Sequence, residues 1–260
     1  MVFKMKNKLL KIILVIVIAI CLVFSTILII NKLHNSSEKQ LSTTTINLDL
    51  PINYMLVSYA YSFATPEEAI GTVDYAFVAK INSIKRTDYR NPVSIETVAD
   101  GSLTKTLYDP YTIYDVTVIE NIKGELTKTN NIELEQKGGL EKNEKSYIFP
   151  SEMGLLNFGE YYIILANASV SDGTLGIDHP NMVVPLGNIN NEQEINKIKE
   201  TSSLNNIQSI NNEKAEYSNT EYDSLKKVLE YKAAYLNQKI PADKTETIKS
   251  SKYDASYQTQ

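Results

Sequence analysis

The chain has 260 residues, a formal net charge of −5, one Cys, two His and no Trp, and this length allows one or two domains of about 100–200 residues each. One Cys excludes an intrachain disulfide framework and any zinc or iron–sulfur site that needs several thiolates. Because the first 34 residues contain five lysines and no acid, the overall −5 leaves −10 on the remainder, which argues against a nucleic-acid partner.

An uncharged apolar run covers residues 12–30, in which only Ser25 and Thr26 are polar. At a rise of about 1.5 Å per residue, a helix of this length spans about 28 Å, close to the hydrocarbon core of a bilayer. Four lysines precede the run and Lys32 follows it, so the positive-inside rule places the N-terminus in the cytoplasm and the bulk outside. We therefore predict a cytoplasmic stub and a single-pass plasma-membrane anchor over residues 1–31.

Two features of this run allow other interpretations. A cleavage site at residues 23–25 would make the protein secreted, but the apolar run continues to Ile30, which favours an uncleaved anchor. Lipidation of Cys21 would need a small residue before it, and Ile20 stands there, so an apolar role in the helix is favoured. With no Cys outside the run and a usage rich in Asn, Lys and Ile, we expect a Gram-positive cell envelope as the setting.

The exported part is predicted to begin with a polar tether over residues 32–45 and to continue as one domain over residues 46–190. Thr65 and Pro66 have the positions of an N-cap and a first helical residue, and two acids follow, so a short helix is expected there. Alternation of apolar residues then predicts a strand over residues 75–84.

Residues 85–110 are polar and end in Asp109-Pro110, and they are expected to form an irregular insertion. Period-two patterns predict further strands at residues 111–120 and 131–135, and an apolar run after a turn predicts one at residues 161–166. Two short strands are expected around residues 173–177 and 182–186. Five or six strands with short turns and one long loop predict a mainly β fold, a small OB-like antiparallel barrel with a short N-terminal helix.

A helical extension is predicted over residues 191–240. Its first helix opens with an Asn-x-x-Glu capping box at Asn191 and is expected to fade in the Ser- and Asn-rich stretch 201–213. A stronger helix over residues 220–238 carries an apolar face at 3.6-residue spacing and ends before a Pro. The polar residues 241–260 are predicted to be a disordered tail.

Four segments of the domain occur in an order that resembles a known family: VDYAFVAKINSI, YTIYDVTVIENIKGEL, NNIELEQKGG and LLNFGEYYIILAN. Across roughly residues 66–188 they resemble extracytoplasmic domains of low-GC Gram-positive bacteria that are related to the barrel of tissue inhibitors of metalloproteinases. The most specific pieces are Ile122-Lys123-Gly124, Gly138-Gly139 and residues 158–162. The resemblance implies an OB-like β-barrel and little about activity, because most such bacterial domains are uncharacterised.

The chain departs from the animal members of that superfamily at the position that matters for inhibition. Those inhibitors chelate the zinc of their target through a free N-terminal Cys that disulfides hold in place. The exported part of this chain contains no Cys, so inhibition by that route is not expected. A shared fold is a safer inference here than a shared function.

His179 is the candidate for acid–base chemistry in the domain, with Asp178 beside it. Adjacent residues of an extended segment point to opposite faces and no catalytic motif accompanies the pair, so a loop residue before Pro180 is the favoured interpretation. No calcium-loop spacing links the scattered acids, which are expected to be solvated: Glu133, Glu135, Glu141 and Glu144. We predict no catalytic residue, metal site or cofactor.

Glycines and tyrosines mark the predicted strands. Turns and bulges that need a positive φ are expected at Gly124, Gly138, Gly139 and Gly159. The chain has 17 Tyr against six Phe, and Tyr supplies rigid contact area to the binding faces of barrels. A candidate binding face therefore consists of Tyr75, Tyr111, Tyr114, Tyr161 and Tyr162. The alternative is that these rings are half-buried strand residues favoured by β-propensity.

These features favour a membrane-anchored, extracellular binding or interaction module of the cell envelope. Its partner would be another envelope protein or a cell-wall component, bound through the barrel face or residues 85–110. The alternative is an envelope enzyme or protease inhibitor acting outside the membrane; an enzyme should gather His179 with two or more carboxylates in a pocket. A structural role, with the helix over residues 220–238 pairing to another chain, is a third interpretation.

Overall fold

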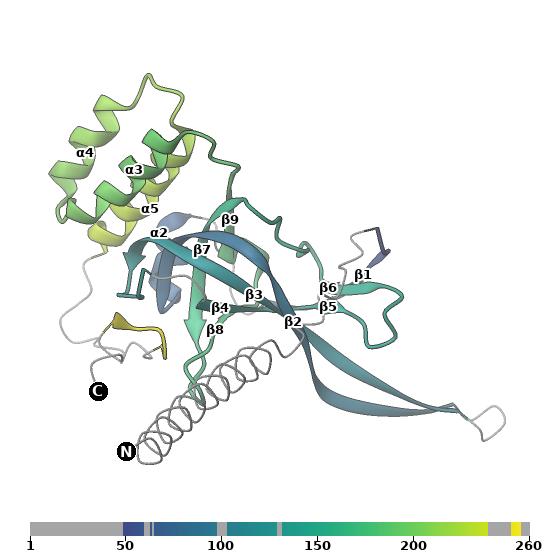
Figure 1. Ribbon diagram of the computed structural model, residues 1–260. Coiled ribbons are helices and arrows are strands. Elements are labelled where there is room, and N and C mark those ends of the chain that lie inside the picture. Colours follow the sequence, from purple (N-terminus) through teal and green to yellow (C-terminus); the bar gives the residue numbers. More distant parts are fainter. Residues whose placement is uncertain are drawn as a thin grey trace, which may run out of the picture. The chain divides into compact units, whose positions relative to one another are not determined.

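The computed structural model describes residues 49–59, 63, 65–97, 103–128, 132–238 and 251–255. The predicted anchor and tether over residues 1–45 lie outside these residues. None of the helices within the described ranges has the length and apolar character needed to cross a membrane. The fold shown in Figure 1 belongs to the unit Leu50–Gln260.

The described part of the chain is mainly β, and its largest sheet is mixed and partly closed into a ring. The strand order is β2-β3-β4-β8-β7-β9, and an additional pairing joins β2 to β7. Because β2 pairs with both β3 and β7, the sheet closes on itself over part of its length. The bounds are β2 (Tyr75–Thr97), β3 (Leu103–Lys123), β4 (Ile132–Lys137), β7 (Tyr161–Ala168), β8 (Leu175–Ile177) and β9 (Val183–Gly187).

Every strand that the sequence predicts is present, but the expectation of a purely antiparallel sheet is wrong. Strands β4 and β8 are parallel, with Leu134 opposite Leu175 and Gln136 opposite Ile177. The long connection between β4 and β7 allows this, since parallel neighbours need a crossover rather than a tight turn. Strands β5 (Gly139–Leu140) and β6 (Tyr147–Pro150) of that connection form a small sheet with β1 (Ile52–Met55), in the order β1-β6-β5.

The prediction of an irregular insertion over residues 85–110 is also wrong. Strands β2 and β3 stay paired far beyond the ring, from Arg90 opposite Asp109 to Thr97 opposite Leu103. We call this two-stranded extension, residues 91–97 and 103–108, the arm; it extends away from the ring in Figure 1. Its sequence alternates β-branched and polar residues, which favours strands, but no side of it is fully apolar, so its composition resembles that of a loop.

Alternate residues of the ring strands point inward and form the core. Fully buried members include Phe77, Ile81, Val116, Leu134 and Ile163. Strand β7 is buried on both of its faces over residues 161–166, all of which belong to the core. The short helix α2 (Pro66–Thr72) packs at one end with Ala69 and Ile70 buried.

Both ends of α2 have capping partners, as the sequence predicts for its start. The Thr65 hydroxyl accepts a hydrogen bond from the Glu68 amide at 3.2 Å, which satisfies one of the free amides of the first turn. At the other end, the Lys123 ammonium donates to the carbonyl of Ile70 at 2.8 Å and also to that of Val73. The last residue of β3 therefore caps α2 through its charge.

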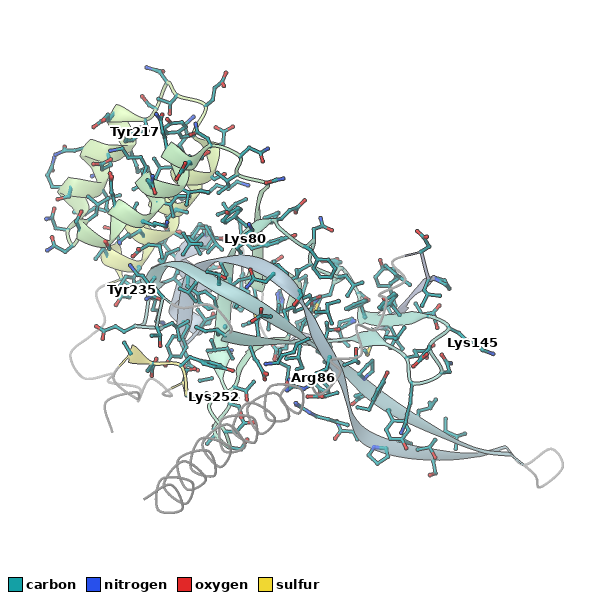
Figure 2. All side chains as sticks on the ribbon, viewed as in Figure 1. Lys80, Arg86, Lys145, Tyr217, Tyr235 and Lys252 are labelled. Carbon is teal, nitrogen blue, oxygen red and sulfur yellow. The ribbon has the colours of Figure 1, made fainter. Side chains whose placement is uncertain are left out.

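The helical extension contains α3 (Glu192–Glu200), α4 (Ile207–Glu216) and α5 (Asp223–Asn237). Helix α5 contacts the other two and reaches α2, β3 and β9. The expected fading over residues 201–213 is wrong for α4, whose N-terminus the Asn206 side chain caps by accepting from the Ser209 amide at 2.9 Å. In this part of the chain, Tyr217 (labelled in Figure 2) stacks on Tyr222 with ring centroids 5.8 Å apart.

The prediction of a disordered tail does not hold for residues 251–255. Asp254 forms an isolated antiparallel bridge with Leu126, and Ser251 is fully buried. A polar composition is insufficient evidence of disorder here, because hydrogen bonds to the ring satisfy several of the polar groups of this segment.

Candidate functional site

A pocket of about 270 Å³ lies between the segment that precedes α2 and the ends of β4 and β8. Aromatic and aliphatic side chains supply most of its apolar wall, and amide, hydroxyl and charged groups supply the rest. Its lining is Val57, Ser58, Tyr59, Phe63, Thr72, Lys137, Pro150, Asn167, Asp178, His179 and Met182. Such a mixture is typical of sites for small ligands. Within the described ranges no group of three or more His, Cys, Asp or Glu side chains is placed to hold a metal ion.

His179 lies in the wall of this pocket and is 8% exposed. Its Nδ1 accepts a hydrogen bond from the Asn181 amide at 3.1 Å, so the neutral ring carries its proton on Nε2. The ring makes edge contacts with Tyr59 and Phe63, at centroid distances of 4.3 and 4.8 Å. His179 is thus the N-cap of the short 3₁₀ turn η1 (Pro180–Met182), which matches the favoured interpretation of a loop residue before a Pro.

The enzyme alternative needs two or more carboxylates around His179. The described lining of the pocket supplies one, Asp178. Burial and the nearby carboxylates of Glu152 and Asp178 raise the pKa of Tyr59, so this phenol stays protonated at neutral pH and donates to the Ser151 carbonyl at 3.3 Å.

Lys137 and Asp178 follow the last pair of the parallel strands β4 and β8, Gln136 opposite Ile177. They therefore stand next to each other at the carboxyl ends of these strands, and both line the pocket. Within the described residues neither side chain has a hydrogen bond or an ion pair. The sequence gives no signal for this pocket beyond His179, because Tyr59, Phe63 and Lys137 come from distant segments.

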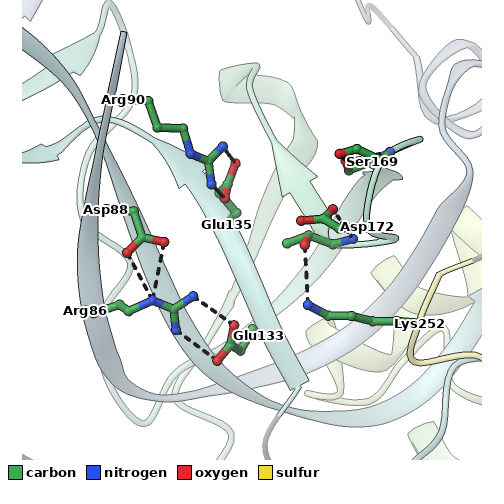
Figure 3. Close-up of polar contacts among 10 residues, drawn as sticks. Arg86, Asp88, Arg90, Glu133, Glu135, Ser169, Asp172 and Lys252 are labelled. Atoms are coloured by element: carbon green, nitrogen blue, oxygen red, sulfur yellow. Dashed lines mark hydrogen bonds and ion pairs between the residues drawn. The ribbon is translucent and has the colours of Figure 1, made fainter. Parts of the chain in front are cut away.

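Ion pairs cover the outer face of the ring, where arginines of β2 reach across β3 to carboxylates of β4 (Figure 3). The Arg86 guanidinium binds Glu133 with two hydrogen bonds, at 2.9 and 3.1 Å, and also contacts Asp88 at 3.1 Å. Arg90 pairs in the same way with Glu135. The sequence predicts that Glu133 and Glu135 are solvated, and the structure instead pairs both with arginines of β2.

These contacts change the acidity of the carboxylate between them. The hydrogen bonds from Arg86 and Lys85 lower the pKa of Glu133 to about 2 despite its partial burial, and Glu133 in turn raises the pKa of Arg86. Lys85 contacts Glu133 at 2.7 Å. Because the charges on this face are already paired with one another, it offers few free groups to a ligand.

The arm carries the exposed apolar side chains nearest to this face. Val93, Ile95 and Leu107 are 57%, 42% and 38% exposed. Val93 lies opposite Leu107, and Val93 and Ile95 are two residues apart, so all three share one side of the ribbon. At the base of the arm, the Lys142 ammonium lies 3.9 Å from the ring centroid of Tyr108.

The tyrosines of the candidate binding face are mostly core residues. Tyr75, Tyr114, Tyr161 and Tyr162 are 7% exposed or less, and Tyr111 is half-buried under the Arg90 guanidinium at 4.4 Å. Buried phenols need a polar partner: Tyr114 accepts from the Leu156 amide at 3.1 Å. Burial raises the pKa of Tyr114 well above its usual range and that of Tyr162 to about 12.

All four glycines that the sequence assigns to turns have a positive φ: Gly124, Gly138, Gly139 and Gly159. At two of them the chain also passes close to a ring. A Cβ on Gly124 would lie 2.4 Å from Tyr75, and one on Gly138 would lie 2.4 Å from Phe149. These positions therefore require both the backbone freedom and the small size of glycine.

Comparison with known proteins adds no identification. No family model matches the chain, and no curated protein matches it.

Proposed function

We propose that this protein is a binding module of a bacterial cell envelope, held in the plasma membrane by one N-terminal helix with the ring outside. The support for the location is the apolar run over residues 12–30 and the excess of lysines before it. The support for binding is the combination of an exposed arm and a pocket with one carboxylate.

The ring is proposed to be an OB-like barrel of the superfamily that includes the tissue inhibitors of metalloproteinases. A five-stranded, partly open barrel is the architecture of that fold, and β2, β3, β4, β8 and β7 follow one another around the ring within the described chain. The motifs that carry the resemblance have packing roles that such a barrel needs. Lys123 caps α2, and the missing side chains of Gly124 and Gly138 leave room for the rings of Tyr75 and Phe149.

The arm is the proposed contact surface, and its exposed apolar side is the observation that carries the proposal. A two-stranded hairpin gains little stability by itself in water, and exposed apolar groups that lie together mark sites of protein contact. Val93, Ile95 and Leu107 form such a group. We propose an envelope protein as the partner, because the side chains of Val93, Ile95 and Leu107 offer no hydrogen-bonding group to a wall polysaccharide.

The experiment uses the full chain in cells of its source. A photo-reactive benzoylphenylalanine replaces Ile95 on the arm, and the matched control places it at the exposed Lys214 of α4. We expect one reproducible cross-linked protein from position 95 and none of that size from position 214. Equal cross-linking from both positions would contradict the assignment to the arm, and a cross-link to wall material in place of a protein would contradict the choice of partner.

A shortened arm gives a second, independent measurement. Arg90 and Asp109 face each other, so replacing residues 91–108 with Asn-Gly joins them by a two-residue turn. In this shortened chain the benzoylphenylalanine is placed at Thr117, on the outer face of the ring. The cross-linked partner should then disappear, while an unchanged unfolding transition shows that the chain still folds. Retention of the partner would show that the barrel face, not the arm, binds it.

The location is tested with a single reactive thiol. The full chain with Cys21→Ala and Ser94→Cys should react with a membrane-impermeant maleimide on intact cells, whereas a thiol at Lys6 should react only after lysis. Release of the labelled chain into the medium would support a cleaved signal rather than an anchor.

A further inference from the structure

The five described residues at the C-terminal end, Ser251–Ala255, bind to the ring although residues 239–250 separate them from α5 among the described parts. We call this segment the clip and its binding surface the groove. The groove consists of residues 125–127, Tyr75, the amide of Glu133, and the loop of Gly173 and Thr174. In Figure 3, Lys252 of the clip lies beside that loop.

Backbone hydrogen bonds hold the clip as a short added strand. The Thr127 amide donates to the Tyr253 carbonyl at 2.9 Å, and the Ala255 amide donates to the Glu125 carbonyl at 2.9 Å. These two bonds flank the bridge between Leu126 and Asp254. This geometry is that of peptide binding by strand addition, in which the main chain supplies affinity and side chains supply specificity.

Side chains of the clip make specific contacts in addition. The buried Tyr75 hydroxyl donates to Asp254 Oδ2 at 2.8 Å and accepts from the Ser251 amide at 2.7 Å. The Tyr253 hydroxyl accepts from the Glu133 amide at 3.2 Å. Ser251 Oγ donates to the Gly173 carbonyl at 3.1 Å. The groove therefore recognises three of the five residues, in the pattern Ser-x-Tyr-Asp.

One buried side-chain oxygen of the clip lacks a hydrogen-bond partner among the described residues. Asp254 Oδ1 is buried and accepts no hydrogen bond from the described residues. A buried carboxylate oxygen without a partner costs free energy, which weakens the clip relative to the number of its other contacts. This cost favours release of the clip without unfolding of the ring.

We propose that the groove is a reversible peptide-recognition site for segments of the form Ser-x-Tyr-Asp, and that the clip of the same chain is its ligand. The Tyr75 hydroxyl and the amides of Thr127 and Glu133 recognise the ligand through hydrogen bonds. This proposal does not rest on the arm, which lies on other residues of β2 and β3. When the clip leaves, the groove is open to a peptide of the same chemistry.

The competition experiment uses the full chain with Tyr253→Ala and Asp254→Ala and a fluorescent peptide of residues 249–257. Because the clip belongs to the same chain as the groove, its effective concentration is on the order of millimolar, and the unmodified chain should bind this peptide at least about tenfold more weakly than the variant. A peptide with the same two alanines should not bind the variant, and a peptide with Lys252→Ala should bind it normally.

Two results of this experiment would overturn the proposal. One is the absence of peptide binding by a variant whose circular dichroism and unfolding transition match those of the unmodified chain. The other is equal binding by the variant and the unmodified chain, because binding would then lie outside the groove.

Hydrogen exchange of the unmodified chain tests the same idea without a variant, in case the variant does not fold. The amides of Thr127 and Ala255 should exchange at least about tenfold faster than those of Ile163 and Ile164 in β7, because the clip opens while the ring stays closed. Exchange of all four amides at the rate of global unfolding would mean that the clip is a permanent strand, and the proposal would fail.

Discussion

Strands β2 and β3 form two regions of opposite character along a single hairpin. In the ring, residues such as Phe77 and Ile81 are fully buried, because β7 pairs with the other edge of β2 and closes a core. In the arm, the apolar residues Val93 and Ile95 are about half exposed, and the pairing of the two strands continues without a core. Strand pairing and burial are therefore separable in this molecule, and stability should follow burial.

The largest expected effect contrasts one residue from each region. Phe77→Ala in the ring should lower the free energy of unfolding by about 3–5 kcal/mol, since it removes a fully buried ring and leaves a cavity. Ile95→Ala in the arm should change it by less than about 0.5 kcal/mol, because the side chain is about half exposed and belongs to no core. Chemical denaturation of both variants measures the difference. Similar losses would mean that the arm is packed in solution.

The next effect concerns the turn at the end of β3. Gly124→Ala should lower the free energy of unfolding by about 1–3 kcal/mol, because φ is +85° and the new Cβ would lie 2.4 Å from the Tyr75 ring. Gly154→Ala is the matched control, as no atom lies within 4 Å of a Cβ there. Thermal unfolding of the two variants compares them. A loss as large in the control would point to a general effect of removing glycine.

A smaller effect depends on pH and links the ring to the base of the arm. The pKa of Glu133 is lowered to about 2 by Arg86, so its ion pairs stabilise the folded state above the ordinary value near 4.5 and lose this contribution as the pH falls toward 2. Partial exposure keeps the contribution below about 1 kcal/mol. Glu133→Gln should flatten the decline of stability between pH 4.5 and pH 2. An unchanged slope would show that the ion pair does not form in solution.

The smallest effect belongs to the arm alone. Lys142→Ala removes the ammonium 3.9 Å from the Tyr108 ring, an interaction of about 0.5–1 kcal/mol at exposed sites. We expect global stability to change within the error of denaturation, while amides of the arm, such as that of Val93, exchange faster. Unchanged exchange in the arm would show that Lys142 does not restrain it.

The sequence predicts the strands and helices whose pattern of apolar residues matches their burial in the fold. The alternation around Phe77 and the apolar run around Ile163 mark core strands, and the Thr65 cap marks the start of α2. The arm, in contrast, has strand propensity without a buried face, so composition alone suggests a loop. Helix α4 is missed for a related reason: it has a single buried residue, Ile210, in a stretch of Ser and Asn.

The candidate sites were less accessible to sequence reasoning, because each brings distant segments together. Tyr59, Lys137 and His179 line one pocket. Their proximity can be predicted only when the parallel pairing of β4 and β8 is known. The clip needs the position of Tyr75, which the sequence suggested as an exposed contact residue and which instead is buried and bonds Asp254. The polar composition of a tail does not show whether another part of the chain forms hydrogen bonds with its polar groups.

The pairing of β2 with β7 has a consequence for the order in which the molecule folds. The β2–β3 hairpin closes between neighbouring segments, whereas Tyr75 must meet Ala166 from far along the chain. Long-range pairing is delayed by the entropy of closing the intervening loop. Ring closure is therefore expected to be the slow step, and an intermediate that stops before it would expose the free edge of β2 to other chains.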